Sequence, residues 1–174
     1  MCGRITTVRI LLATVIALAA AGQAVPPVPA KRPVTLAAKQ LSVTTSQSLE
    51  AAAAGSTLSL FVDVFPKPKM HVYAPEQTGG YIRIELTLDD HAAVKEAKPI
   101  FPKASDYYFD PLKETFKVFD APFRIRQDIT LAAASSGDPL RITGTLRYQA
   151  CDDEVCYRPD TVKVSWTVTR RPRA

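Results

Sequence analysis

The chain has 174 residues, of which 22 are basic, 17 are acidic and 47% are hydrophobic, giving a formal net charge of +5. This length is sufficient for one domain with a buried core. Apart from Arg170, Arg171 and Arg173, the basic residues are scattered, which argues against a nucleic-acid partner because such a face needs clustered charge.

Residues 1–24 are predicted to form a signal peptide. Arg4 and Arg9 precede an apolar run, Ile10–Ala21, that is too short to span a bilayer. Small residues favour cleavage after Ala21 or Ala24, which would also remove Cys2. No later segment is long and apolar enough to cross a membrane, so we expect a soluble periplasmic protein without stable membrane insertion.

The remaining chain divides into three predicted regions. Residues 25–37, which contain the run "PPVPAKRPVT", are rich in Pro and are predicted to be a linker because Pro cannot donate to a sheet ladder. Residues 38–170 form the predicted domain, and residues 171–174 form a basic tail.

Hydrophobic residues alternate with period two through most of the domain, which is typical of half-buried strands. The Ala-rich run at 48–56 predicts either one or two helical turns or a connecting loop. Pro, Gly, Asp and Ser gather in the breaks between the strands. The fold class is therefore predicted to be all-β, an immunoglobulin-like antiparallel β-sandwich. The predicted strands cover 58–64, 82–88, 123–131, 140–148 and 162–168, with shorter ones at 40–45, 94–98 and 116–119.

Cys151 and Cys156 lie in the stretch "RYQACDDEVCYRPD", between two predicted strands. A pair of cysteines in an exported protein predicts a disulfide, which is either a structural bond or a redox-active one. Strand parity places Cys151 outward and Cys156 inward, although Pro159 makes an irregular hairpin tip the expectation, with at least one sulfur at the surface.

Three acidic residues separate the cysteines and are predicted to tune them. Asp152, Asp153 and Glu154 place negative charge beside both sulfurs, which disfavours a thiolate. A protonated thiol attacks other disulfides slowly, and this property suits a carrier that reacts inside a docked complex. The residues alone leave the structural and the redox interpretation open.

The same stretch, with "KMHVYAPEQTGGYIRIELTLDD" and "YYFDPLKETFKVFDAPFRI" upstream, resembles the N-terminal periplasmic domain of the thiol:disulfide interchange protein DsbD. The resemblance implies an immunoglobulin-like fold with a redox-active cysteine pair that passes reducing equivalents to thioredoxin-like periplasmic proteins, including those of cytochrome c maturation. It implies that Cys156 forms the mixed disulfide and that Cys151 resolves it.

The resemblance also implies a cap over the cysteines. In "SDYYFDP" it makes Tyr108 or Phe109 the shielding residue and Asp106 a nearby acid. Two departures from the family stand out: the gap between the cysteines is four residues, where the best-known members have five, and the chain ends at Ala174. We therefore expect a separate membrane protein to donate the reductant. The alternative function is a non-catalytic immunoglobulin-like binding module with a structural disulfide.

Neither a cofactor nor a metal is predicted. His71 lies beside Met70, but no second His or Cys stands at ligand spacing, and His91 lies in a charged turn. His71 is therefore interpreted as a strand-edge residue near the cysteine hairpin. Trp166 falls on the inward phase of the last strand and is predicted to be in the core.

Overall fold

The computed structural model describes residues 34–132 and 139–171, and this part of the chain contains strands and no helix. The predicted signal peptide, most of the predicted linker and residues 172–174 of the tail lie outside the described residues. Within them we find no helix with the length and hydrophobicity that crossing a bilayer requires.

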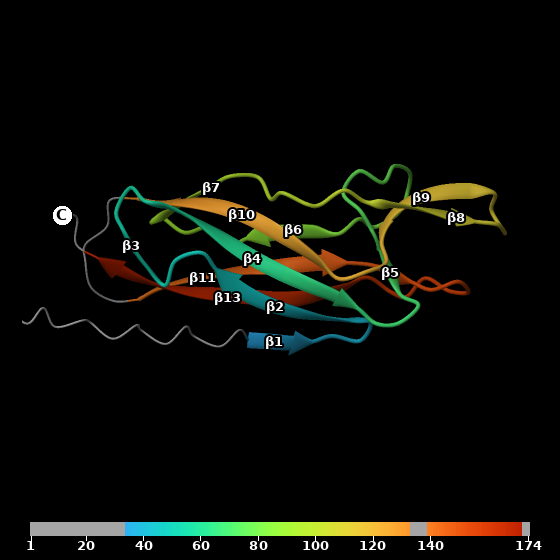
Figure 1. Cartoon of the computed structure of the whole chain (residues 1–174), viewed down its shortest axis with the longest axis horizontal. Coiled ribbons are helices and arrows are strands. Elements are labelled where there is room, and N and C mark those ends of the chain that lie inside the picture. The colour runs from blue at the N-terminus through green and yellow to red at the C-terminus, as the bar shows by residue number, and fades with distance from the viewer. Residues whose placement is uncertain (1–33, 133–138, 172–174) are drawn as a thin grey trace, which may run out of the picture.

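Two sheets form a sandwich, which confirms the predicted all-β, immunoglobulin-like architecture (Figure 1). The first sheet has the order β1-β2-β4-β10-β7 and the second has the order β3-β13-β11-β6. All neighbours are antiparallel except β3 and β13, which are parallel. The first sheet comprises β1 (Val34–Ala37), β2 (Leu41–Gln47), β4 (Thr57–Pro66), β7 (Val94–Glu96) and β10 (Phe123–Leu131), and the second comprises β3 (Ala51–Ala53), β6 (Glu85–Leu88), β11 (Leu140–Tyr148) and β13 (Asp160–Arg171).

Alternate residues of both sheets form the core between them. Along β4, Leu58, Leu60 and Val62 are buried while their neighbours are more exposed, as the period-two pattern predicts. Trp166 of β13 is buried, which confirms its predicted place in the core. Its Nε1–H donates a hydrogen bond of 3.2 Å to the carbonyl oxygen of Phe61, and this bond connects the two sheets.

Three local predictions differ from the structure. Residues 34–37 of the predicted linker form β1, since no Pro follows Pro33 there and Leu36 pairs with Val43 of β2. The Ala run contributes β3 instead of a helical turn, because it pairs with the end of β13. The strand predicted over 82–88 is shorter, as its pairing with β11 begins only at Glu85.

A third, smaller sheet lies at one end of the sandwich (Figure 1) and has the order β12-β5-β9-β8. It comprises β5 (His71–Tyr73), β8 (Ser105–Phe109), β9 (Glu114–Phe119) and β12 (Ala150–Cys151), of which the sequence pattern predicted only part of β9. A separate hydrophobic cluster holds it together, formed by Tyr73, Phe116, Val118 and Cys151. This sheet brings the cysteines next to residues that are distant in sequence.

Candidate functional site

The cysteine hairpin begins where β11, a strand of the second sheet, ends. After Tyr148 the pairing of β11 with β13 ends, and the chain re-forms as β12, in which Cys151 pairs with His71 of β5. Cys151 and Cys156 face each other as an antiparallel bridge and are joined by a disulfide with an S–S distance of 2.09 Å. The predicted pairing is therefore confirmed.

The two cysteines differ strongly in exposure. Cys151 is 1% exposed and belongs to the small hydrophobic cluster, whereas Cys156 is exposed. The expectation of an irregular hairpin tip with at least one sulfur at the surface is therefore confirmed. The outward parity of Cys151 was wrong, because both faces of β12 are covered and Ala150 and Cys151 are buried in succession. A molecule approaching from solvent meets Cys156 first.

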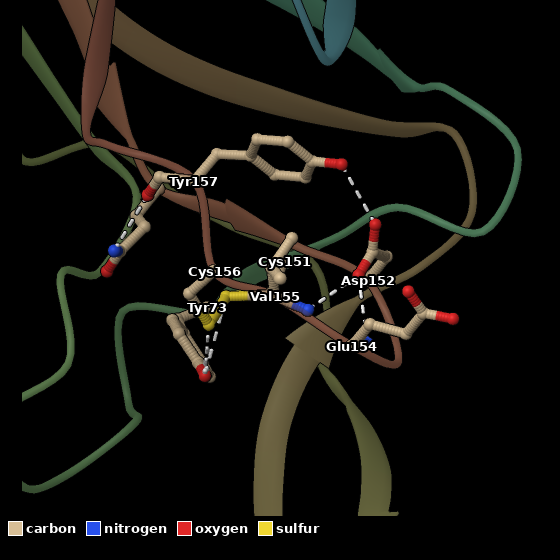
Figure 2. Close-up of a disulfide and its surroundings, with 8 residues drawn as sticks. Tyr73, Cys151, Asp152, Glu154, Val155, Cys156 and Tyr157 are labelled. Atoms are coloured by element: carbon tan, nitrogen blue, oxygen red, sulfur yellow. Dashed lines mark hydrogen bonds between the residues drawn. A yellow bond between two sulfur atoms is a disulfide. The ribbon is translucent and has the colours of Figure 1, made fainter.

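Asp152 organises the acidic loop. Its carboxylate accepts hydrogen bonds from the backbone N–H groups of Val155 and Glu154, at 2.8 and 2.9 Å, and from the hydroxyl of Tyr157 at 2.9 Å (Figure 2). The bonds to the backbone, followed by the one to Tyr157, lower the pKa of Asp152. The carboxylate is therefore a structural acceptor that fixes the turn between the two cysteines.

Tyr73 of β5 lies against the disulfide. Its hydroxyl oxygen is 3.6 Å from the sulfur of each cysteine (Figure 2), and because a disulfide carries no S–H, the hydroxyl is the donor. Tyr73 is buried, and this burial raises its pKa, so that the phenol stays protonated at neutral pH. Its edge-to-face contact with Phe116, at 5.6 Å between ring centroids, holds the ring in place.

His71 is a buried titratable group beside the disulfide, 4% exposed. Its ring packs on Tyr107 at 4.6 Å and against Tyr73 at 5.9 Å between centroids. Desolvation lowers its pKa, although the nearby carboxylates of Asp153, Asp120 and Asp152 oppose this effect. The interpretation of His71 as a strand-edge residue near the cysteine hairpin is confirmed, since it is the first residue of β5 and pairs with Cys151.

The β8–β9 hairpin covers a cavity of about 130 Å³ that reaches both cysteines. Tyr107, Phe109 and Leu112 of this hairpin form part of the cavity wall. The hydroxyl of Tyr107 donates a hydrogen bond of 2.7 Å to Asp153, which ties this hairpin to the acidic loop. That bond is also the main reason why the pKa of Tyr107 rises to about 12. The wall is mostly aromatic, so it limits access of water to the sulfurs.

The predicted shielding residues divide between the two faces of β8. Phe109 lies in the cavity wall with Tyr107, whereas Tyr108 is 56% exposed and does not line the cavity. Asp106 is on the same face as Tyr108, and its carboxylate forms an ion pair with Lys117. Side chains alternate along a strand, so in the sequence "DYYF" Tyr107 faces the cavity together with Phe109, although the resemblance pointed to Tyr108 or Phe109.

The three acidic residues do not act alike. Asp152 fixes the turn, Asp153 accepts from Tyr107, and Glu154 lines the cavity. Their predicted effect on the thiol pKa stays a prediction, since the structure shows the oxidised pair. In the described ranges, no three His, Cys, Asp or Glu residues are grouped as metal ligands would be.

Tyr73 and Tyr107 have no role predicted from the sequence, although both lie in the segments that carry the family resemblance. The available signal was the pattern His-x-Tyr, because residues two apart on a strand share a face. That pattern predicts that His71 and Tyr73 lie together, and the structure places both beside Cys151.

Comparison with known proteins finds a family match over residues 37–167, to the model described as thiol:disulfide interchange protein DsbD, N-terminal. The N-terminal periplasmic domain of ScsB from Proteus mirabilis superposes with a TM-score of 0.51 at 13% identity, over 77% of this chain and 49% of that one. This chain thus spans about half the length of that structure, and at this identity the similarity concerns the fold alone.

A second solved structure is the reduced DsbD N-terminal domain of Neisseria meningitidis, with a TM-score of 0.42, 18% identity, and coverage of 72% of this chain and 85% of that one. A search of curated proteins finds no match.

Proposed function

This chain belongs to the family of the DsbD N-terminal domain, and on that premise we propose that it is a thiol-disulfide exchange module in which Cys156 exchanges with partners while Cys151 resolves the mixed disulfide. The difference in exposure supports these roles. Cys156 is exposed, and Cys151, 1% exposed, lies behind it. Cys156 is therefore the cysteine that a partner sulfur reaches once the β8–β9 hairpin moves away from the disulfide.

The reduced module would act in two displacements. The Cys156 thiolate attacks one sulfur of a partner disulfide, forming a mixed disulfide and releasing the other partner sulfur as a thiolate. The Cys151 thiolate then attacks the Cys156 sulfur, which re-forms the Cys151–Cys156 bond seen in the structure and releases the second partner sulfur. Two electrons pass to the partner, and the two protons that the module loses balance those that the partner dithiol gains.

Tyr73 assists the step in which the buried Cys151 becomes a thiolate. In the reverse direction, a donor thiolate attacks Cys156 and Cys151 leaves as a thiolate in an apolar cluster, where an unpaired charge is costly. The Tyr73 hydroxyl, 3.6 Å from both sulfurs, supplies a hydrogen bond to that thiolate. We assign Tyr73 as a positioning and donor group for Cys151.

The family acts on thiol-disulfide partners, and the DsbD N-terminal domain is periplasmic. For this chain we propose the same compartment, reached through the predicted signal peptide, and thioredoxin-like proteins as the partners. The recessed position of the disulfide beneath the β8–β9 hairpin calls for a partner whose reactive cysteine projects from its surface.

Redox titration of the purified protein separates exchange from a permanent structural bond. We expect a midpoint potential above about −250 mV, in the range of exchange proteins, whereas one below about −300 mV is typical of structural disulfides and would refute the exchange function.

Trapping tests the two roles. Cys151→Ala should accumulate a mixed disulfide with a thioredoxin-like protein through Cys156, because the resolving sulfur is missing. Cys156→Ala should accumulate little, since Cys151 is 1% exposed. Non-reducing electrophoresis and mass spectrometry measure both adducts. More adduct from Cys156→Ala than from Cys151→Ala would reverse the assignment.

A further inference from the structure

A second concave surface adjoins the disulfide cavity, and its charge is opposite to that of the acidic loop. It is a groove of about 560 Å³ between residues 81–86 and 98–101, with Arg147 of β11 beside them. Its polar lining is mainly basic, consisting of Arg83, Lys98 and Arg147 with one carboxylate, Glu85. We refer to these four residues and the space between them as the basic groove.

The cations of the basic groove are available to a ligand. Arg83, Lys98 and Arg147 are all exposed. Within the described residues, neither Lys98 nor Arg147 forms an ion pair, and Arg83 donates only to the carbonyl oxygen of Pro75, at 3.2 Å. Glu85, the register partner of Arg147, offsets one of the three charges. The groove therefore presents a net excess of positive charge.

Tyr81 connects the basic groove to the disulfide. It lines both the groove and the disulfide cavity, and its ring packs on Tyr73 at 4.8 Å between centroids. The groove also includes the first residues of β6, which begins on the side of the small sheet (Figure 1). A redox interface of about 600 Å² per partner has a radius of roughly 14 Å, so a protein docked on Cys156 extends over Tyr81 toward the groove.

The surface around the cavity thus has an acidic region on one side and a basic region on the other. Asp153 and Glu154 lie on the side of the cysteine loop, and the basic groove lies beyond Tyr81. Complementary charges of this kind orient an approaching protein and raise its association rate, while wrong orientations are disfavoured.

We propose that the basic groove binds an acidic segment of the redox partner. Partners whose carboxylates lie at some distance from the reactive cysteine are therefore preferred. This inference rests on the proposed exchange function and adds a specificity determinant to it. The groove selects and orients the partner, while Cys156 carries out the chemistry.

The probe is a pair of synthetic peptides, each closed by a Cys-x-x-Cys disulfide and followed by six Gly/Ser residues and a tail of four Glu or four Gln. A flexible spacer of this length has a root-mean-square span of roughly 13 Å, which matches the interface radius. The reduced full chain should reduce the Glu-tailed peptide at least about threefold faster than the Gln-tailed one at low ionic strength, and 0.5 M salt should remove the difference.

The groove variant is Lys98→Glu/Arg147→Glu, which should lose or invert the preference for the Glu tail. The matched control is Lys95→Glu/Arg141→Glu, which makes the same change in net charge. Arg141 lies on the same strand and the same side of it as Arg147, roughly 20 Å away. The control should keep most of the preference. Equal losses in both variants, or no preference in the wild type, would overturn the proposal.

A control reaction with the neutral disulfide of 2-mercaptoethanol shows whether a negative result refutes the groove proposal alone or the exchange function as well. If the wild type reduces the neutral disulfide but shows no preference for the Glu tail, the groove proposal alone is refuted. If it reduces neither the neutral disulfide nor the peptides, the exchange function is refuted as well, and the groove proposal with it.

Discussion

The hydrogen bond between Tyr107 and Asp153 is predicted to hold the β8–β9 hairpin closed over the disulfide. Tyr107→Phe removes the hydroxyl but keeps the ring that packs on His71 at 4.6 Å, so the change isolates one hydrogen bond of 2.7 Å. A bond to a charged group contributes about 1.5–3 kcal/mol when buried, but Asp153 is exposed and solvent competes for it, so we take about 1 kcal/mol. This corresponds to a roughly fivefold rise in the population of the open hairpin.

The assay is the rate of disulfide reduction by excess dithiothreitol at pH 7. If the hairpin must open before a thiolate can reach the sulfur of Cys156, Tyr107→Phe should react up to about fivefold faster than the wild type. The matched control is Tyr108→Phe, the same change on the neighbouring residue, whose side chain is 56% exposed and outside the cavity wall. Equal rates for the two variants would refute the closed-hairpin reasoning.

Two further predictions concern the neighbours of the disulfide. Asp152→Ala should lower the free energy of unfolding, because two backbone N–H groups and the Tyr157 hydroxyl lose their acceptor, while Asp152→Asn should lower it less, because its amide oxygen still accepts. Urea unfolding measures both, and an Asn variant as unstable as the Ala variant would contradict this account. His71 is buried and its pKa is lowered, so below pH 6.5 the unfolded chain binds a proton that the folded chain does not. The stability that is present above pH 6.5 is therefore lost as the pH falls, by at most about 1.4 kcal/mol per pH unit. His71→Phe should flatten this part of the pH profile in urea unfolding between pH 5 and 7, and an unchanged slope would exclude His71 as its source.

The sandwich could be predicted from the sequence because its strands are long and have one buried face. Alternation over Leu58, Leu60 and Val62 reports burial directly, so the positions of β4, β10, β11 and β13 followed from it. The shorter strands β5, β8 and β12 have two to five residues, too few for a period to be recognised. The pairing of β5 with β12 and with β9 depends on contacts between residues about 45 to 80 positions apart, and only β8 pairs with a strand that is near it in sequence, β9.

The all-β class, the pairing of Cys151 with Cys156 and the acidic character of the loop between them follow from the sequence alone, because each depends on local pattern or on residue type. Which cysteine is buried depends on the tertiary structure, because both faces of β12 are covered, so that Ala150 and Cys151 are buried in succession. The tertiary structure also decided that Tyr107 and not Tyr108 faces the cavity and that the Tyr73 hydroxyl contacts both sulfurs. The physical reason is that strand pairing at the end of the sandwich sets which faces meet, and a shift of one residue turns a side chain from the cavity to the solvent.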